Sequence, residues 1–321
     1  MPNAPAALPH LILQGGTPMP ALGLGTWKAA PGEVGQAVRT ALELGYQHID
    51  CAAIYGNEAE IGAALAGTLA SGVVRREQLW ITSKLWNDCH APEQVRPALE
   101  RTLADLQLDH LDLYLIHWPV AHRHGVLMPS QASDQIPLAQ LPLEQTWSAM
   151  EALVDAGLVR QIGVSNCSAA KLAALLPHCR IQPAMNQIER HPWLQQRDLL
   201  AFCQQHGIAV TAYSPLGSPV AGGPAPLLSD PTILAIAAAH GASAAQVLLA
   251  WGIACSTAVI PKSVQRERLA ANLAAAQLQL TAAEIEHIHG LDRHHRFVDG
   301  SFWELPGGPY SRANLWDEPL C

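Results

Sequence analysis

Acid-base side chains stand where three short apolar runs of the sequence end. Asp50 closes "YQHID", and Tyr55 follows it by five residues. Lys84 closes "QLWITSK", and His117 closes "LDLYLIH". A phenol near pKa 10 is a poor proton donor at neutral pH, but a nearby ammonium favours the phenolate and lowers that pKa. Lys84 could tune Tyr55 in this way, held by Asp50, while a neutral His117 orients a carbonyl oxygen. Such a set could protonate a carbonyl while a hydride arrives at its carbon.

A plainer interpretation of the first two residues is also open. Asp50 could cap the next turn, and Tyr55 could pack against a neighbouring helix, because short polar residues favour turns and tyrosines are often half-buried. Lys84 is harder to explain in this way, since an unpaired ammonium at the end of a buried strand is costly. It needs an acid, and Asp50 is available.

The elements that would position these residues form a repeating pattern. Ala/Leu/Glu/Gln-rich segments with helical spacing, such as 33–44, 93–106 and 144–156, alternate with short apolar runs, which predicts a parallel sheet. Eight units favour a single (β/α)₈ TIM barrel that spans residues 1–321, rather than an open doubly wound sheet. The site of such a barrel lies where its strands end. The eight runs are "LGLGTW", "YQHID", "QLWITSK", "LDLYLIH", "VRQIGVS", "PAMNQ", "IAVTAYS" and "TAVIPKS".

Three further segments complete the expected fold. "LILQGGTPMPAL" at 11–22 has a Gly-Gly turn between apolar runs, which predicts an N-terminal β-hairpin at the barrel bottom. The uncharged stretch 242–261 is interrupted by polar residues and ends β-branched, so a buried helix leading into a strand is expected, not a membrane span. The tail at 291–321 is rich in Pro, Gly and aromatics, which is typical of an extended C-terminal loop crossing the surface.

Composition limits the partners and the compartment. A formal charge of −8 with only four lysines argues against a nucleic-acid or anionic-membrane surface, so small molecules remain. Seven scattered cysteines without a Cys-x-x-Cys pair fit reduced thiols. The N-terminus lacks a basic n-region, so we expect a cytoplasmic protein. "HRH" at 122 and "HIH" at 287 could ligate a metal, but neither has an acidic third ligand in spacing, so no metal is expected.

Eight motifs in register carry a family resemblance. From residue 11 to 292 the chain resembles the aldo-keto reductases, many of which are monomers, and we expect the same state here. Each motif alone would be weak, but the ordered set is specific. The motifs are "GLGTWK", "HIDCAAIYGNE", "ITSKLW", "LIHWP", "IGVSN", "NQIERHP", "YSPLGS" and "VIPKS" followed by "ER".

The resemblance implies a catalytic tetrad and a cofactor, NADPH or NADP⁺. The tetrad falls on Asp50, Tyr55, Lys84 and His117. Contacts with the cofactor fall on Gly25, Thr26, Trp27, Asp50, Ser165, Asn166, Gln187, Tyr213, Ser214, Leu216, Ser218, Lys262, Ser263, Arg268 and Asn272. Ser165, Asn166 and Gln187 would pair the nicotinamide carboxamide, Tyr213 would stack on its ring, and the last four residues would meet the adenosine end. The substrate wall would comprise Trp27, Tyr55, Trp86, His117 and Trp118.

Local chemistry bears on several of these assignments. Ser165 and Asn166 could instead cap the helix that follows, but Ser168 can serve as that cap. Lys262 and Arg268 on either side of Ser263 suit the 2′-phosphate of NADPH, whereas a ribose hydroxyl usually meets an acid. No Gly-x-Gly-x-x-Gly or Walker A motif is present, so a search for standard nucleotide fingerprints would miss the cofactor.

The chain also departs from the family pattern. Ala271 stands where relatives often have Glu beside the adenosine end, and Val220 stands where an aspartate would pair with Lys28 across the cofactor loop. We expect Val220→Asp to slow NADP⁺ release modestly. In the tail, Arg296 and Arg312 could reach the pocket mouth and favour acidic aldehydes, although a solvated surface arginine is the more ordinary interpretation of Arg312.

Two rival functions remain open. The chain could be a catalytically silent NADPH-binding barrel that serves as a regulatory or structural subunit, although an intact tetrad speaks against this. It could also be a barrel hydrolase or isomerase that uses acids such as Asp50 and Asp112. The lack of a second carboxylate at a strand end weakens that alternative. The reading favoured by the sequence is reduction of a small aldehyde or ketone with NADPH.

Overall fold

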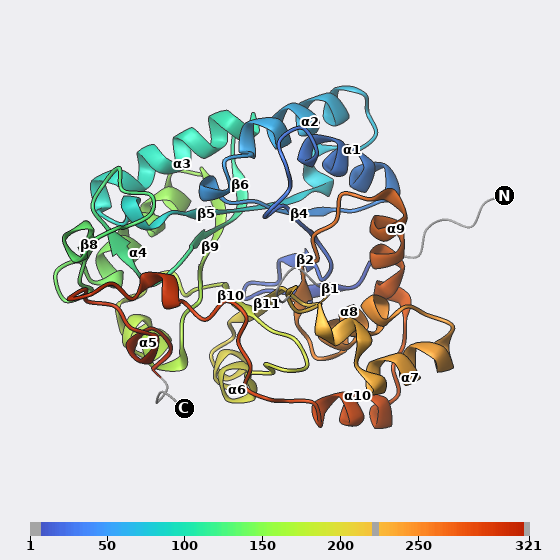
Figure 1. The fold of residues 1–321 in the computed structure, drawn as a ribbon. Helices are drawn as coiled ribbons and strands as arrows, with labels where there is room; N and C mark the ends of the chain where they lie inside the picture. Colours follow the sequence, from blue (N-terminus) through green and yellow to red (C-terminus); the bar gives the residue numbers. More distant parts are fainter. Residues whose placement is uncertain (1–7, 220–224, 318–321) are drawn as a thin grey trace.

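The computed structural model describes residues 8–219 and 225–317. Its largest sheet contains eight parallel strands, each beside its neighbours in chain order, so that β3 and β12 end the series. Parallel bridges Leu22–Val259 and Gly25–Lys262 join these two ends. Helices surround the strands on the outside (Figure 1). This arrangement fits the expected (β/α)₈ barrel.

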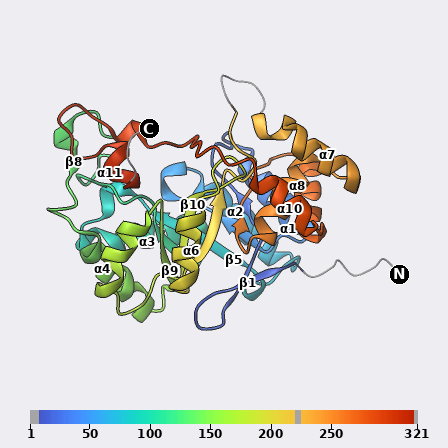
Figure 2. The same ribbon diagram turned by 90° about the horizontal axis from the view of Figure 1, so that it is seen from below.

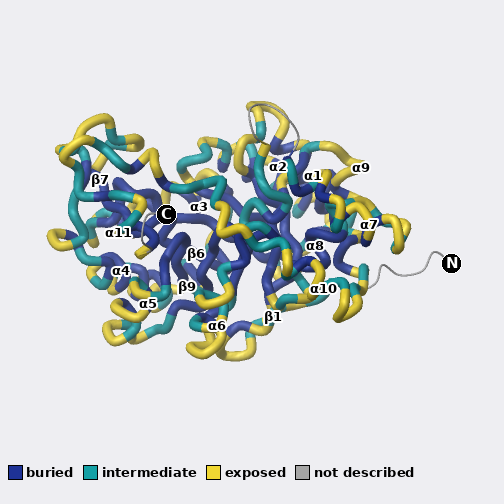
Figure 3. Tube along the Cα trace, turned by 60° about the horizontal axis from the view of Figure 1, so that its bottom comes forward, coloured by how far each residue is buried: buried dark blue, intermediate teal, exposed yellow. Residues whose placement is uncertain are grey.

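The strands form because their sequences are nearly continuous apolar runs that helices cover. Every residue of β5 and β6 is buried, and Figure 3 shows the buried strands at the centre of the molecule with exposed residues on the outer helices and loops. The eight strands correspond to the eight predicted runs. Their bounds are β3 (Leu24–Gly25), β4 (His48–Asp50), β5 (Trp80–Leu85), β6 (Leu111–Ile116), β9 (Val159–Ser165), β10 (Met185–Glu189), β11 (Ala209–Tyr213) and β12 (Ala258–Val259).

The helices confirm the predicted segments to within a residue or two. Ser168 accepts a hydrogen bond from the backbone N–H of Lys171 and so caps α5, as the sequence suggested. Their bounds are α1 (Val34–Leu44), α2 (Glu58–Ala70), α3 (Pro92–Leu106), α4 (Leu143–Asp155), α5 (Ala169–Leu175), α6 (Arg197–Gln205), α7 (Pro231–His240), α8 (Ala244–Ala254), α9 (Arg266–Ala274), α10 (Ala282–His289) and α11 (Arg312–Trp316).

The uncharged stretch forms α8 followed by β12, as expected. Within the described ranges, no single helix is both long and apolar enough to cross a membrane. The helices α7 and α8 satisfy those criteria only when taken together, and they are bent by 92° relative to each other.

The expected N-terminal hairpin is present. Strands β1 (His10–Ile12) and β2 (Pro18–Pro20) pair antiparallel, with Gly15 and Gly16 at positive φ in the turn between them. Leu13 and Met19 are buried in one apolar cluster with Trp80, Leu113 and Met185 from the barrel strands. Figure 2, seen from below, shows the hairpin projecting beneath the strands. The hairpin therefore contributes side chains to the barrel core.

The tail contains more regular structure than the expected surface loop. It forms a 3-10 turn, η8 (Ser301–Trp303), and the short helix α11. Trp303, Leu315 and Trp316 are buried against Trp86 and Trp118 of the barrel. In Figure 1 the red C-terminal segment runs from α10 across to the opposite side of the barrel. Aromatic side chains bury large apolar areas, which explains how this Pro- and Gly-rich segment packs against the barrel.

Candidate active site

The four predicted acid-base residues meet at one end of the barrel. Asp50 is the last residue of β4, Lys84 is the penultimate residue of β5, and His117 directly follows β6. Tyr55 ends a 3-10 turn, η1 (Ala53–Tyr55), just after β4. Parallel strands in register bring their carboxyl ends to the same edge, which accounts for the convergence.

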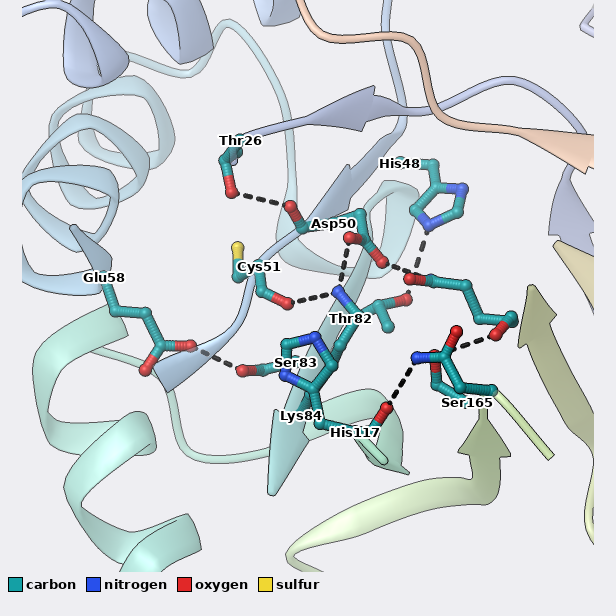
Figure 4. Close-up of polar contacts among 12 residues, drawn as sticks. Thr26, His48, Asp50, Cys51, Glu58, Thr82, Ser83, Lys84, His117 and Ser165 are labelled. Carbon is teal, nitrogen blue, oxygen red and sulfur yellow. Dashed lines mark hydrogen bonds and ion pairs between the residues drawn. The ribbon is translucent and has the colours of Figure 1, made fainter. Parts of the chain in front are cut away.

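Lys84 forms a buried ion pair with Asp50. Lys84 is 0% exposed, and its Nζ donates to Oδ1 of Asp50 at 2.5 Å and to the carbonyl of Cys51 at 2.8 Å (Figure 4). The second carboxylate oxygen of Asp50 accepts from Nε2 of Gln187 at 2.7 Å. Asp50 therefore does not cap the next turn. Its side chain neutralises an ammonium that the barrel interior would otherwise exclude.

Tyr55 lies beside this pair and faces the site. Its ring is 6.4 Å from that of Trp27 and 5.8 Å, edge-on, from that of His117, measured between centroids. Nζ of Lys84 is 5.3 Å from the Tyr55 ring centroid. We expected Lys84 to lower the pKa of Tyr55 below its ordinary value. The ammonium acts in that direction, but burial outweighs it and raises the pKa of Tyr55 to about 12. Tyr55 therefore holds its proton at neutral pH.

His117 is neutral at the same pH. Burial, and then the charge of Lys84, lower the pKa of its imidazole well below the ordinary value. Its ring lies 5.0 Å from that of Trp86. Its backbone carbonyl accepts a hydrogen bond from Nδ2 of Asn166 at 3.0 Å, which ties the end of β6 to the end of β9. The neutral ring can donate one hydrogen bond, as the sequence analysis expected.

The three residues with amide-pairing side chains form one connected group. Oγ of Ser165 donates to the carbonyl of Gln187 at 2.8 Å, and Nδ2 of Asn166 lies 3.2 Å from that Oγ. The hydroxyl of Tyr213 donates to Oδ1 of Asn166 at 2.7 Å. Asn166 has φ +60°, in the left-handed region that few non-glycine residues adopt. Strain of this kind is common at binding sites and is held by the surrounding bonds.

A cavity of about 620 Å³ opens above these residues. Lys84 lies beneath its floor, bonded to Asp50. Three predicted residues do not line it, namely Ser263, Arg268 and Asn272. Ser263 and Asn272 are buried, and Arg268 is exposed on α9. The predicted residues that do line it are Gly25, Thr26, Trp27, Asp50, Tyr55, Trp86, His117, Trp118, Ser165, Asn166, Gln187, Tyr213, Ser214, Leu216, Ser218 and Lys262.

Part of the cavity wall was not found by sequence reasoning. Trp303 packs 5.8 Å from both Trp86 and Trp118, between ring centroids, and completes an aromatic wall. The tail has no regular spacing of residues that would predict which of its side chains reach the cavity. Outside the tail, the position of Ile54 next to Tyr55 was the one usable signal in the sequence. The missed lining residues include Ile54, Met128, Val298, Phe302 and Trp303.

Glu189, the last residue of β10, attaches the tail to the barrel. Its side chain is 0% exposed, and its two carboxylate oxygens accept from the backbone N–H groups of Phe297 and Val298, each at 2.7 Å. Nε2 of His191 lies 2.8 Å from the same carboxylate. Because Val298 lines the cavity, Glu189 positions the wall that the tail supplies.

Glu189→Gln should therefore raise the KM for the carbonyl substrate several-fold while changing kcat little. The variant turns one acceptor into an NH₂ group that faces a backbone N–H, and hydrogen bonds to charged groups contribute about 1.5–3 kcal/mol. Glu304→Gln, which alters a half-buried tail acid that does not line the cavity, is the matched control and should leave KM unchanged. Steady-state kinetics and hydrogen exchange of the tail provide the measurements. Unchanged KM and unchanged tail exchange in Glu189→Gln would contradict this role.

The structure also bears on the predictions for the tail arginines and for the cofactor loop. Arg312 pairs with Asp299 and Glu304 and does not line the cavity, so its proposed contact with a substrate carboxylate has no support here. Arg296 lies over the ring of Trp316, 3.7 Å from its centroid. Val220 is outside the described residues. Lys28 Nζ lies 4.0 Å from the ring centroid of Trp27.

The hydrolase or isomerase alternative requires a second acid where the barrel strands end. The expectation that no second carboxylate stands at a strand end was wrong, because Glu189 ends β10; its carboxylate, however, accepts from the backbone N–H groups of Phe297 and Val298 and does not line the cavity. Asp112 stands near the amino end of β6, at the opposite end of the strand from His117. Its carboxylate is paired with Arg76 at 2.8 Å and Arg160 at 3.0 Å and accepts from the backbone N–H of Ile81. Asp112 is therefore a structural ion-pair partner and cannot act together with Asp50.

Comparisons with known proteins agree with this geometry. A profile of the Aldo/keto reductase family matches residues 21–293. An aldo/keto reductase of Synechocystis sp. is 56% identical over 318 residues, which is 97% of each chain. Aldo-keto reductase family 1 member A1 of Bos taurus is 46% identical over 294 residues, which is 90% of each.

Two solved structures are similar in both fold and sequence. An aldose reductase from Schistosoma japonicum has a TM-score of 0.86 and 43% identity, covering 92% of this chain and 96% of that one. A Bombyx mori aldo-keto reductase in complex with NADP has a TM-score of 0.84 and 39% identity, covering 94% and 99%. This chain therefore belongs to the aldo/keto reductase family.

Proposed function

We propose that this chain reduces small aldehydes or ketones to alcohols with NADPH, and that Tyr55 is the general acid. The observation that carries the proposal is a wholly buried Lys84–Asp50 ion pair directly beneath a protonated phenol and a neutral imidazole. A fold that needed only a stable core would be served better by apolar residues at these positions, because desolvating the two charges is costly. A role in proton transfer at the cavity floor would explain why the chain keeps this buried ion pair.

The residues around the cavity fit NADPH. Ser165, Asn166 and Gln187 offer donors and acceptors at one end, and Tyr213 presents a ring beside them. Loop residues 214–219 and the exposed cation Lys262 also line the cavity. Bound there, the cofactor would supply a hydride to the carbonyl carbon. The chain's own task would be to orient the substrate and to deliver a proton.

The proton delivery follows from the electrostatics. His117 would donate a hydrogen bond to the substrate oxygen and hold it within reach of Tyr55. The Tyr55 hydroxyl would then give its proton to that oxygen as negative charge develops there. The phenolate left behind would be stabilised by Lys84, which lies on the inner side of the ring. Asp50 would keep Lys84 in place throughout, through the 2.5 Å ion pair.

The aromatic lining favours apolar carbonyl compounds. Trp27, Trp86, Trp118, Phe302 and Trp303 all face the cavity, and rings of this kind bury the apolar part of a ligand while a few polar groups fix its orientation. We propose aromatic and other hydrophobic aldehydes as the substrate class.

A direct assay tests the reaction. Purified protein mixed with NADPH and an aromatic aldehyde should consume NADPH, followed by its near-ultraviolet absorbance, and produce the alcohol. Binding of NADPH without consumption of any carbonyl compound across a substrate panel would favour the silent-subunit alternative. Failure to bind NADPH at all would overturn the proposal.

The cofactor preference yields a separate prediction. Lys262→Ala and Arg268→Ala should each lower kcat/KM for NADPH by about tenfold or more with little effect for NADH, because a charged hydrogen bond to the 2′-phosphate contributes about 1.5–3 kcal/mol. Arg266→Ala is the matched control on the same helix, since its guanidinium pairs with Glu43 at 3.0 Å. Equal kcat/KM for NADH and NADPH in the unaltered protein would refute the assignment.

A further inference from the structure

A cluster of metal-ligand side chains lies outside the cavity, on two loops that follow neighbouring strands. Asp88 and Cys89 belong to a 3-10 turn, η3 (Asn87–Cys89), after β5. His124 follows the short strand β7 (Ala121–His122), in the loop after β6. Among the described residues, these three form one group whose potential ligand atoms all lie within 4.8 Å of one another.

The distances are close to those of a tetrahedral metal site. Sγ of Cys89 lies 3.4 Å from Oδ1 of Asp88 and 4.0 Å from Nδ1 of His124. That Nδ1 is 3.9 Å from Oδ2 of Asp88. Zinc bonds of about 2.0–2.3 Å at tetrahedral angles separate ligand atoms by roughly 3.3–3.6 Å. Asp88 meets the other two residues through different carboxylate oxygens, so a site that uses one of these oxygens starts from separations of up to 4.8 Å and needs to contract by up to ~1.5 Å. The His124 side chain is 52% exposed and free to make that movement.

We propose that Asp88, Cys89 and His124 bind a Zn²⁺ ion, with water as the remaining ligand. One carboxylate oxygen, one thiolate sulfur and one imidazole nitrogen form a mixed set that suits this borderline-soft cation. On binding, the Cys89 thiol releases its proton to solvent as the Zn–S bond forms. His124 gives up the Nδ1 proton that now points to the Asp88 carbonyl, 3.2 Å away, and takes a proton at Nε2, so that the ring stays neutral. No oxidant or reductant is involved.

The surroundings of the cluster support a bound ion. Asp88 and Cys89 border a hollow of about 350 Å³, which gives room for a hydrated cation to enter. With one carboxylate and one thiolate as ligands, a divalent ion and its ligands carry no net charge, and the neighbouring Arg101 adds one positive charge. Nη2 of Arg101 lies 3.6 Å from Sγ of Cys89 and would remain as a hydrogen-bond donor to the thiolate, an arrangement typical of the groups that surround metal ligands.

The ion would join two segments that shape the substrate cavity. Nε1 of Trp86, a wall residue, donates to the carbonyl of Leu127 at 2.7 Å, and the backbone N–H of Gly125 donates to Oδ2 of Asp88 at 3.1 Å. Met128 in the same loop lines the cavity. Zinc would add a stronger link between η3 and the 122–128 loop and so restrain this wall. The inference does not depend on the proposed reaction.

The sequence predicts no metal, because neither "HRH" at 122 nor "HIH" at 287 has an acidic third ligand in spacing. His122 of "HRH" is in fact buried beside Trp303, with Nδ1 3.3 Å from the carbonyl of Val126, so it does not converge with His124. The ligands that do converge, Cys89 and His124, stand 35 residues apart in sequence. Only the pairing of β5 with β6 brings them together.

The test uses the full-length, reduced protein with Co²⁺ as a spectroscopic substitute for Zn²⁺, without cofactor or substrate. We expect a stoichiometric thiolate-to-cobalt charge-transfer band with visible bands of tetrahedral intensity, both abolished by Zn²⁺. His124→Gln, an exposed substitution that should fold normally, and Cys89→Ala should each weaken Zn²⁺ binding at least about 100-fold in chelator competition, since changes in surrounding groups alone cost about 10–100-fold. Zn²⁺ should slow hydrogen exchange of the 122–128 loop in the unaltered protein but not in His124→Gln or Cys89→Ala.

Cys255→Ala is the matched control, because Sγ of Cys255 lies 3.7 Å from Nε2 of His289 and so forms a second close thiol–imidazole contact within the described residues. It should keep the cobalt spectrum and the Zn²⁺ affinity. Absence of a thiolate band in the unaltered protein would overturn the proposal. So would loss of the band in Cys255→Ala, or unchanged Zn²⁺ affinity in His124→Gln.

Discussion

Tyr55→Phe is expected to lower kcat for carbonyl reduction by about 10²–10⁴-fold, the usual contribution of general acid-base catalysis. Phenylalanine keeps the ring that packs beside Trp27 and His117 and deletes only the hydroxyl. The affinity for NADPH should therefore change little. The two quantities can be measured separately, by single-turnover reduction and by quenching of protein fluorescence on cofactor binding.

The pH dependence of reduction should follow from the same two groups. The pKa of Tyr55 is about 12, so the phenol is protonated throughout the neutral range and loses its proton only in strong alkali. The pKa of His117 is well below its ordinary value, so the imidazole is neutral there and gains a proton only in acid. We therefore expect single-turnover reduction to vary little across the neutral range. A steep change near the ordinary histidine pKa of about 6.5 would show that His117 titrates normally.

Tyr46→Phe is the matched control for Tyr55→Phe. Tyr46 is buried, its hydroxyl donates to the carbonyl of Leu269 at 3.0 Å, and it does not line the cavity. Its loss should reduce stability by about 1 kcal/mol and leave the reduction rate near normal. If Tyr55→Phe kept near-normal turnover in a chemistry-limited assay, Tyr55 would be a packing residue, as the plainer interpretation of the sequence holds.

Sequence reasoning located the strand-end residues because the barrel pattern is periodic. Each apolar run is long enough to specify a buried strand, and parallel strands bring their ends to one edge. The convergence of Asp50, Lys84 and His117 can therefore be predicted without knowing how the side chains pack. The same logic identified the cap of α5, since Ser168 has the residue type and position that a helix N-terminus prefers.

What the sequence could not predict depended on distant packing. The net pKa of Tyr55 is set by burial competing with Lys84, and the amount of burial is unknown until the walls are placed. Trp303 reaches the cavity because Glu189, more than 100 residues earlier in the chain, holds the backbone of Phe297 and Val298. A Pro- and Gly-rich tail carries no period that would reveal such a contact.

Lys84→Met should abolish measurable reduction and also lower the free energy of unfolding by about 3–5 kcal/mol. The loss of stability arises because the Asp50 carboxylate stays buried without its counter-charge, keeping only the bond from Gln187. Lys171→Met is the matched control, since Lys171 forms a more exposed pair with Asp317 at 2.7 Å. It should lower the free energy of unfolding by only about 0–1 kcal/mol and leave reduction intact.

The double variant Asp50→Asn/Lys84→Met separates stability from chemistry. Replacing both partners of a buried ion pair removes two desolvation costs together, so most of the stability lost in Lys84→Met should return. Reduction should not return, because Tyr55 still lacks the ammonium that stabilises its phenolate. Denaturant unfolding and single-turnover kinetics should be measured on the unaltered protein, on Lys84→Met and on the double variant. If reduction recovered together with stability, the ion pair would serve only to hold the barrel together, and Tyr55 would need another source of stabilisation.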